Sequence, residues 1–88
     1  MLVRYFAAAG AAAGVEEERH DLPEGTTLEG LIVALLALDR SERPADAPSL
    51  PAVISRSSFL CNEIAVRDRA LVLRPDDVID VLPPFAGG

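Results

Sequence analysis

The segment TTLEGLIVALLALDR, residues 26–40, constrains the fold more than any other part of the chain. Its large apolar residues recur three and four positions apart, as they do on one face of an α-helix. Thr26 and Glu29 have the spacing of a capping box, which satisfies the free amides at a helix start. We therefore predict a helix over residues 26–40, with a buried face made of Leu28, Leu31, Ile32, Leu35 and Leu36.

The other patterned segments are short and rich in residues that favour β-strands. Predicted apolar strands are residues 2–7, 58–64 and 78–82, with 69–73 as a further short segment. In the last of the three, Ile79 and Val81 should share one face and Asp80 the other.

The segment VEEERHDL, residues 15–22, is so charged that it suits only the edge of a sheet. Between it and the first strand, the Ala-rich residues 8–14 predict one helical turn stopped at Gly14, which can adopt positive φ. Residues 41–57 read as a long connection containing a short helical turn near residues 50–54.

A single main helix flanked by strands must bury its apolar face against a sheet, which makes a two-layer α+β domain. The first and last strands are too apolar for an edge, so we predict that they are neighbours. The expected fold is a β-grasp, with a mixed sheet of four to five strands packed on one main helix.

Charge and composition exclude several classes of function. The net charge of -6 would repel a phosphate backbone, so nucleic acid is not an expected partner. No apolar run reaches the roughly 20 residues that span a bilayer, which predicts no membrane partner and a cytoplasmic location. His20 has no zinc-ligand spacing to another His or Cys, so we expect no metal or other cofactor bound by this chain.

Neither reactive side chain predicts an active site. His20 lies in the charged segment and is expected to be a solvated edge residue. Cys61 lies in an apolar segment and is expected to be a small core residue, since an unpaired buried cysteine behaves as a small hydrophobe. Catalysis by this chain alone is therefore not expected.

The ending VLPPFAGG predicts a domain over residues 1–82 and a tail over 83–88. Pro83 and Pro84 bias the chain toward extended backbone, and Phe85 can anchor on a partner. Ala86, Gly87 and Gly88 are slim enough to thread a narrow channel, which would bring the Gly88 carboxylate to a buried site. The alternative is a frayed terminus.

Several segments together resemble the ubiquitin-like sulfur carriers, and within them the small subunits of molybdopterin synthase. LPPFAGG is similar to their Pro-Pro-Val-x-Gly-Gly ending, and RYFAAA to their opening strand. LPEGTTLEGLIVAL resembles the family's helix start, LCNEIAV its third strand, and LRPDDVIDVLPP the approach to the tail. Gly10 and Ala11 depart from the pattern, because the family often has Arg-Glu after the alanines of that opening strand.

The resemblance implies that an E1-like adenylyltransferase uses ATP and Mg²⁺ to adenylate Gly88. A sulfur donor, such as a cysteine desulfurase or rhodanese, would then convert Gly88 to a thiocarboxylate. The carrier would dock on the large subunit of molybdopterin synthase as a heterotetramer and donate sulfur to cyclic pyranopterin monophosphate. Expected contacts with that partner are Phe6, Pro83, Pro84 and Phe85.

Other functions also fit this pattern. Sulfur carriers for thiamin thiazole or cysteine synthesis have similar tails, and a ubiquitin-like modifier would be joined through Gly88 to protein amines. A β-grasp binding domain with an incidental tail is a further possibility.

Overall fold

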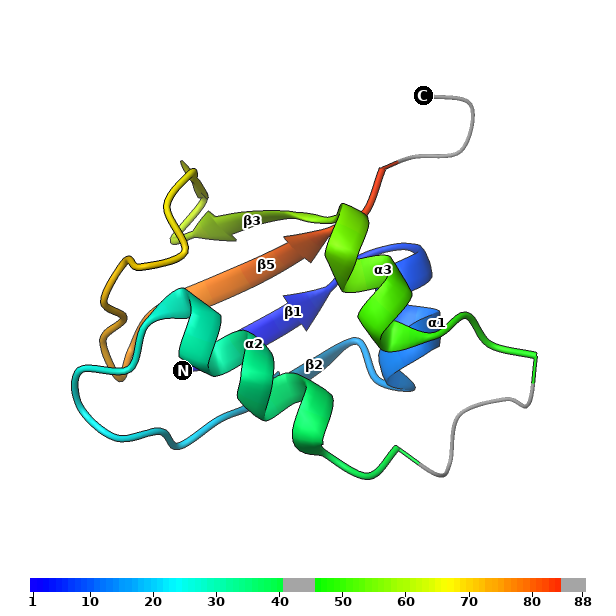
Figure 1. Cartoon of the computed structure of the whole chain (residues 1–88), viewed down its shortest axis with the longest axis horizontal. Coiled ribbons are helices and arrows are strands. Elements are labelled where there is room, and N and C mark those ends of the chain that lie inside the picture. The colour runs from blue at the N-terminus through cyan, green and yellow to red at the C-terminus, as the bar shows by residue number, and fades with distance from the viewer. Residues whose placement is uncertain (41–45, 85–88) are drawn as a thin grey trace.

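The computed structural model describes residues 1–40 and 46–84 and has the predicted α+β architecture (Figure 1). Its strands are β1 (Leu2–Tyr5), β2 (Glu17–Arg19), β3 (Ser58–Cys61), β4 (Ile64–Val66) and β5 (Val78–Leu82). Its helices are α1 (Ala8–Ala13), α2 (Leu28–Ala37) and α3 (Leu50–Arg56). In Figure 1, α2 and α3 lie in front of the sheet, which makes two layers.

The sheet has the order β2-β1-β5-β3-β4. β1 and β5 pair in parallel and the other neighbours pair antiparallel, so the sheet is mixed. This confirms that the first and last strands are neighbours and that the charged segment forms an edge. Because β1 and β5 run in parallel register, Arg4 lies opposite Asp80 and Tyr5 opposite Val81.

The apolar face of α2 packs into the core between the two layers. Leu28, Leu31, Ile32 and Leu35 are buried, as predicted, with Val3, Ile79 and Val81 of the central strands among their core neighbours. Leu36 was also predicted to be buried, and this is wrong, because its side chain is 39% exposed. Eight residues after Leu28 the helix has turned by roughly 80°, so Leu36 lies at the side of the packed face.

The start of α2 differs by one residue from the predicted capping box. Thr27 is the N-cap, and its hydroxyl accepts a hydrogen bond from the Gly30 amide at 3.1 Å. The hydroxyl of Thr26 instead donates to the carbonyl of Pro23. With Thr27 as the N-cap, the third helical position is Gly30, so Glu29 lies one residue too early to close the box and instead pairs with Arg69 at 3.4 Å. The helix is shorter than the predicted 26–40 at both ends.

The Ala-rich turn and the second short helix form as predicted. α1 ends at Gly14, which has φ of 81° and donates its amide to the carbonyl of Gly10. Ala7, before the helix, also has positive φ, at 49°. α1 packs against α3, so both short helices lie at the end of the sheet where β1 and β5 finish.

The predicted strand over 58–64 is divided into two. Asn62 and Glu63 both have positive φ, which makes the tight turn of a β-hairpin between β3 and β4. The short segment 69–73 forms no strand and contributes one isolated bridge, between Thr27 and Val72. The strand that completes the five-stranded sheet is therefore β4, the second strand of this hairpin.

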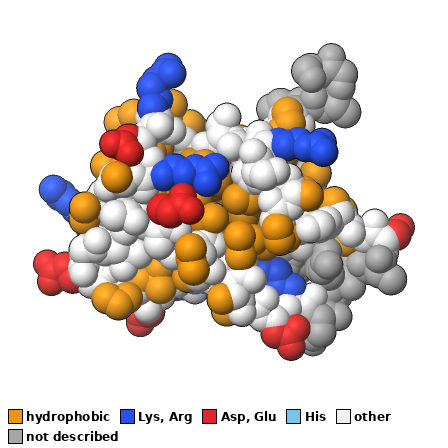
Figure 2. Space-filling model, viewed as in Figure 1, with side chains coloured by type: hydrophobic (Ala, Val, Ile, Leu, Met, Phe, Trp, Pro, Cys, Tyr) orange, Lys and Arg blue, Asp and Glu red, His pale blue; other side chains and the backbone are white. Residues whose placement is uncertain are grey.

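The helix layer exposes several hydrophobic side chains. Figure 2 shows them gathered over the helices, and Val33 of α2 is 61% exposed. No helix within residues 1–40 and 46–84 is long and apolar enough to cross a membrane.

Candidate functional site

The candidate site is built around the point where the chain leaves β5. Pro83 directly follows this strand and is buried, whereas Pro84 is exposed. A hollow of about 200 Å³ lies beside them, lined also by Ala8 of α1 and by Val53 and Arg56 of α3. The first proline of the predicted tail is thus packed against the domain, and the predicted boundary at residue 82 stays a prediction.

The remaining tail residues lie outside the described part of the chain. Phe85, Ala86, Gly87 and Gly88 therefore stay predictions, as do their roles in anchoring, threading and sulfur chemistry.

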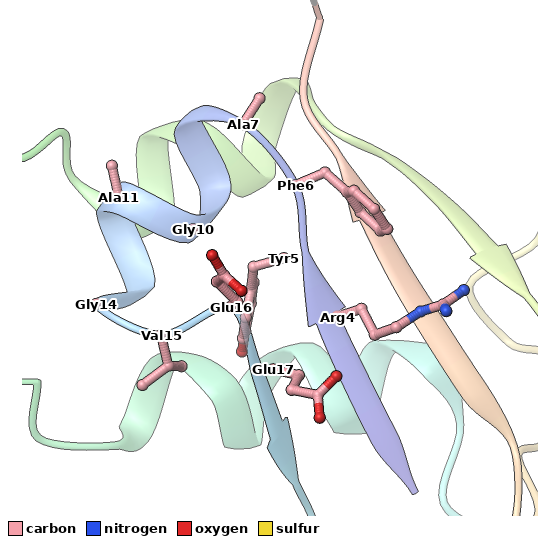
Figure 3. A pocket seen from close by; sticks show the side chains of 10 residues that line it. All are labelled: Arg4, Tyr5, Phe6, Ala7, Gly10, Ala11, Gly14, Val15, Glu16 and Glu17. Atoms are coloured by element: carbon pink, nitrogen blue, oxygen red, sulfur yellow. The ribbon is translucent and has the colours of Figure 1, made fainter.

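Phe6 lies close to the base of the tail. It follows β1, and its amide donates to the carbonyl of Val81 in β5 at 3.2 Å. Its ring is 38% exposed and lies on the sheet face opposite α2, called here the open face (Figure 3). An exposed aromatic ring beside the tail is suited to partner binding, and this role of Phe6 stays a prediction.

Arg4 and Asp80 form an ion pair on the same face. Arg4 donates from Nε to Asp80 Oδ1 at 2.6 Å and from Nη2 to Oδ2 at 2.8 Å, which is a bidentate contact. The hydrogen bond to Asp80 raises the pKa of Arg4. The guanidinium also lies 5.8 Å from the centre of the Phe6 ring. The pair therefore neutralises the two charges, and it places the Arg4 guanidinium beside the Phe6 ring.

Sequence reasoning missed this pair, although a signal was present. Arg4 and Asp80 each occupy the third position of an apolar strand, in LVRY and VIDV. Once the two strands were predicted to be neighbours, opposite charges at matching positions would have predicted a cross-strand ion pair.

A second charged cluster lies on the helix side of β1. Glu18 of β2 accepts hydrogen bonds from Tyr5, from Arg40 and from His20, the last at 2.9 Å. Arg40 also donates to the carbonyl of Ala13, at the end of α1, and to that of Leu35, in the last turn of α2. The cluster therefore joins the C-terminal ends of these two helices to the sheet. Burial alone would raise the pKa of Glu18, but the hydrogen bonds outweigh it and lower the pKa to about 2.

His20 was predicted to be solvated, and this is wrong, because it is only 8% exposed. Its ring turns inward beside Glu18, while its backbone amide donates to the carbonyl of Met1. An edge strand has one face against the core, and His20 follows Glu18 by two residues on that face. The cluster is structural and offers no catalytic arrangement.

Cys61 is half-buried and packs against the core, as predicted. Burial raises the pKa of its thiol, and nearby Asp77 acts in the same direction. A thiol with a raised pKa is a poor nucleophile. Within the described ranges, no three His, Cys, Asp or Glu side chains are grouped so that they could hold a metal ion.

A second and larger hollow opens beside Phe6, and we call it the α1 hollow. It measures about 620 Å³ and lies between α1, the end of β1 and the start of β2. Figure 3 shows the Glu16 side chain directed toward α1 and the Glu17 side chain directed over β1 toward Arg4, with α2 behind the sheet. Gly10 and Gly14 form its wall on the α1 side and leave it without large side chains there.

Comparison with known proteins identifies the family. The model of the ThiS family matches residues 3–88, which is nearly the whole chain. The chain belongs to the ThiS family. The expected resemblance to the ubiquitin-like sulfur carriers is confirmed.

In sequence, this ThiS-family chain is similar to a molybdopterin synthase sulfur carrier subunit from Chlamydomonas reinhardtii. It is 30% identical over 87 residues, which cover 98% of this chain and 95% of the relative. The two proteins therefore share their full domain and not a local motif.

Solved structures agree with the predicted β-grasp fold. A Pyrococcus furiosus protein described as molybdopterin converting factor subunit 1 superposes with a TM-score of 0.71 at 27% identity, covering 96% of this chain and 95% of that one. The small archaeal modifier protein 1 of Haloferax volcanii gives 0.70 at 21% identity, covering 97% of both chains. The second likeness shows the fold alone, so it does not favour a modifier over a carrier.

Proposed function

We propose that this ThiS-family chain is the sulfur carrier subunit of a molybdopterin synthase. The observation that carries the proposal is the full-length match to a carrier subunit of that enzyme, which extends over 98% of the chain. The ending PPFAGG agrees with it, because the family match runs through Gly88.

In this proposal the Gly88 carboxylate attacks the α-phosphorus of ATP on an E1-like adenylyltransferase, which holds Mg²⁺. Pyrophosphate leaves, and an acyl-adenylate remains. The terminal persulfide sulfur of a sulfur donor, such as a cysteine desulfurase or rhodanese, then attacks the acyl carbon, and AMP leaves. A thiol reductant cleaves the S–S bond of the resulting acyl disulfide, so the outer sulfur stays on the acyl carbon and the donor's thiol is released. Gly88 ends as a thiocarboxylate, and this chain needs no bound cofactor for these steps.

The carrier then binds the large subunit of molybdopterin synthase, with which it forms a heterotetramer. Sulfur passes from Gly88 to cyclic pyranopterin monophosphate, and water restores the carboxylate. The catalytic residues belong to the large subunit. Phe6, Pro84 and Phe85 supply contacts to that subunit, and Pro83 packs beside α1 and α3 at the base of the tail.

The charges on the open face support the proposed role of Phe6 in binding the large subunit. Phe6 is exposed close to the base of the tail, while the charges nearest it are already paired with each other. A partner can therefore cover Phe6 without burying an unpaired Arg4 or Asp80, which would be costly.

Complementation tests the proposed pathway. The chain, expressed with its large subunit from the same organism, should restore molybdopterin synthesis to cells that lack their own carrier subunit. The same chain should not restore growth without thiamin to cells that lack the thiamin carrier. Rescue of the second strain but not the first would assign the chain to thiamin thiazole synthesis instead.

A further inference from the structure

The two edge strands of the sheet differ in how well they are protected from pairing with another molecule. β2, at one edge, consists of three charged residues, and charged side chains discourage such pairing. β4, at the other edge, contains only Ile64, Ala65 and Val66. Ile64 is 72% exposed, more than any other large hydrophobic side chain of the described residues. The β4 edge is therefore the one open to a further strand.

The backbone of Ala65 faces outward from the β4 edge. The two-residue turn at 62–63 makes its flanking residues, Cys61 and Ile64, the hydrogen-bonded pair that closes the hairpin. Bonded and non-bonded pairs alternate along antiparallel strands, so Ala65, opposite Leu60, belongs to a non-bonded pair. Its N–H and C=O therefore point away from β3, and no loop or turn in the described part of the chain donates to them or accepts from them.

The charges that flank β4 are complementary to those of a second copy of the chain. Glu63 precedes the strand and Arg67 follows it, and both are exposed. Among the described residues, neither side chain has an ion pair or a hydrogen bond. When two copies pair antiparallel about Ala65, Glu63 of each copy lies opposite Arg67 of the other. Parallel pairing would instead place like charges together, so the flanking charges favour one self-complementary register.

The same register brings apolar side chains together on the helix side of the sheet. Ile64 and Val66 share this face with Cys61 and Phe59, their partners in β3. A hollow of about 560 Å³ opens along the edge and is lined in part by Ile64, Val66 and Leu71. In the antiparallel pair, Ile64 of the second copy lies opposite Val66, with Cβ atoms about 4.5–5.5 Å apart. This side chain therefore covers the hollow.

We propose that two copies of this chain associate through β4, antiparallel and centred on Ala65, to form one continuous sheet. The two-fold axis is perpendicular to that sheet, so both helix layers lie on the same side of it. β5 of one copy runs opposite to β5 of the other, and the two tails therefore leave toward opposite ends and stay accessible to their partners. The strand is short and the net charge of -6 opposes association, so we expect a weak dimer with a Kd of about 100 µM. This inference concerns the free chain and does not rest on the proposed function.

Sedimentation equilibrium between about 10 µM and about 1 mM measures the association. Ala65→Pro removes the outward N–H and leaves the bonds between β3 and β4 in place, so the affinity should fall at least tenfold. Ala65→Ser keeps the N–H and should dimerise within about twofold of wild type, and circular dichroism shows whether both variants fold. A wild type that stays monomeric at 1 mM, or a folded Ala65→Pro variant that dimerises like wild type, would overturn the inference.

Charge reversal tests the register. Glu63→Arg and Arg67→Glu each place like charges together in their own dimer, so each variant alone should associate about fivefold more weakly than wild type. An equimolar mixture of the two should recover the dimer, because every flanking charge then meets its opposite. Glu24→Arg and Arg19→Glu make the same changes of net charge near the other edge and, alone or mixed, should match wild type within about twofold. If the reversal variants and their mixture behave like these controls, the inference is wrong, and the mixture decides the question even if Ala65→Pro does not fold.

Discussion

Neighbouring residues of β1 place two charged clusters on opposite sides of the sheet, and the two differ in their surroundings. Tyr5 points to the helix side, where it meets Glu18 and Arg40, whose side chains are 17% and 10% exposed. Arg4 points to the open face, where its side chain is 34% exposed beside Asp80. The same chemistry thus holds elements together on one side and lies at the surface, beside the partly exposed Phe6, on the other.

Removing the central cation of the buried cluster should have the largest effect on stability. Arg40→Met would leave Glu18 buried without its guanidinium and free the carbonyls of Ala13 and Leu35. We expect a loss of about 3–5 kcal/mol in the free energy of unfolding, as for other buried charges that lose a partner. Urea unfolding at pH 7 measures it, with the exposed Arg67→Met as the control. Equal stability of the two variants would mean that the cluster contributes little.

Acid should weaken the same cluster. Glu18 has a pKa of about 2 in the folded protein against 4.5 in its ordinary state, so its stabilisation is complete above about pH 4.5 and is lost as the pH falls toward 2. The shift corresponds to on the order of 3 kcal/mol. Unfolding at pH 6, 4 and 2.5 should show this loss in wild type and in the exposed control Glu24→Gln. A Glu18→Gln variant with the same pH dependence as wild type would contradict the assignment.

A substitution of Phe6 on the open face should affect binding to the partner more than it affects the stability of the domain. Phe6→Ala should change the free energy of unfolding by less than about 1 kcal/mol, since the ring is partly exposed. The same change should weaken binding to the large subunit about tenfold, because exposed aromatic rings are frequent interface anchors. Val72→Ala, at an exposed position of the loop paired with Thr27, serves as the control. A Phe6→Ala variant that loses several kcal/mol of stability but binds with wild-type affinity would reverse the comparison between the two faces.

The main features of the fold could be predicted because each depends on a local pattern or on strand composition. The spacing of Leu28, Leu31 and Leu35 predicts α2, and the charges of residues 15–22 predict an edge strand. Smaller errors arose where nearby contacts decide. The Thr26 hydroxyl donates to the carbonyl of Pro23, Thr27 caps the helix, and so Glu29 does not close the predicted capping box. His20 was assigned to solvent because its partners, Glu18 and Arg40, meet only in the folded chain.

The sequence motif of the candidate site could be predicted, but the hollow beside it could not. Pro83 and Pro84 mark the base of the tail in the sequence, and the role of Phe6 as a partner contact stays a prediction. The α1 hollow could not be predicted, because it forms where Gly10, Phe6 and Glu16 approach from three separate elements. Small residues such as Gly10 leave no sequence signal for the space that they create.

The central claim is that Gly88 carries sulfur, and intact mass measures it directly. Wild type and a chain lacking Gly88 are incubated with the activating enzyme, ATP, Mg²⁺ and a sulfur donor. Every described buried residue lies at or before Pro83, so we expect the shortened chain to fold. Its end would fall short by one residue, about 3.3–3.6 Å, and a misplacement of about 1 Å can cost on the order of 100-fold in rate. Gly87→Ala should lower the rate less. Wild type should gain the mass of one oxygen-to-sulfur exchange and the shortened chain should not; an equal gain in both would contradict the carrier function.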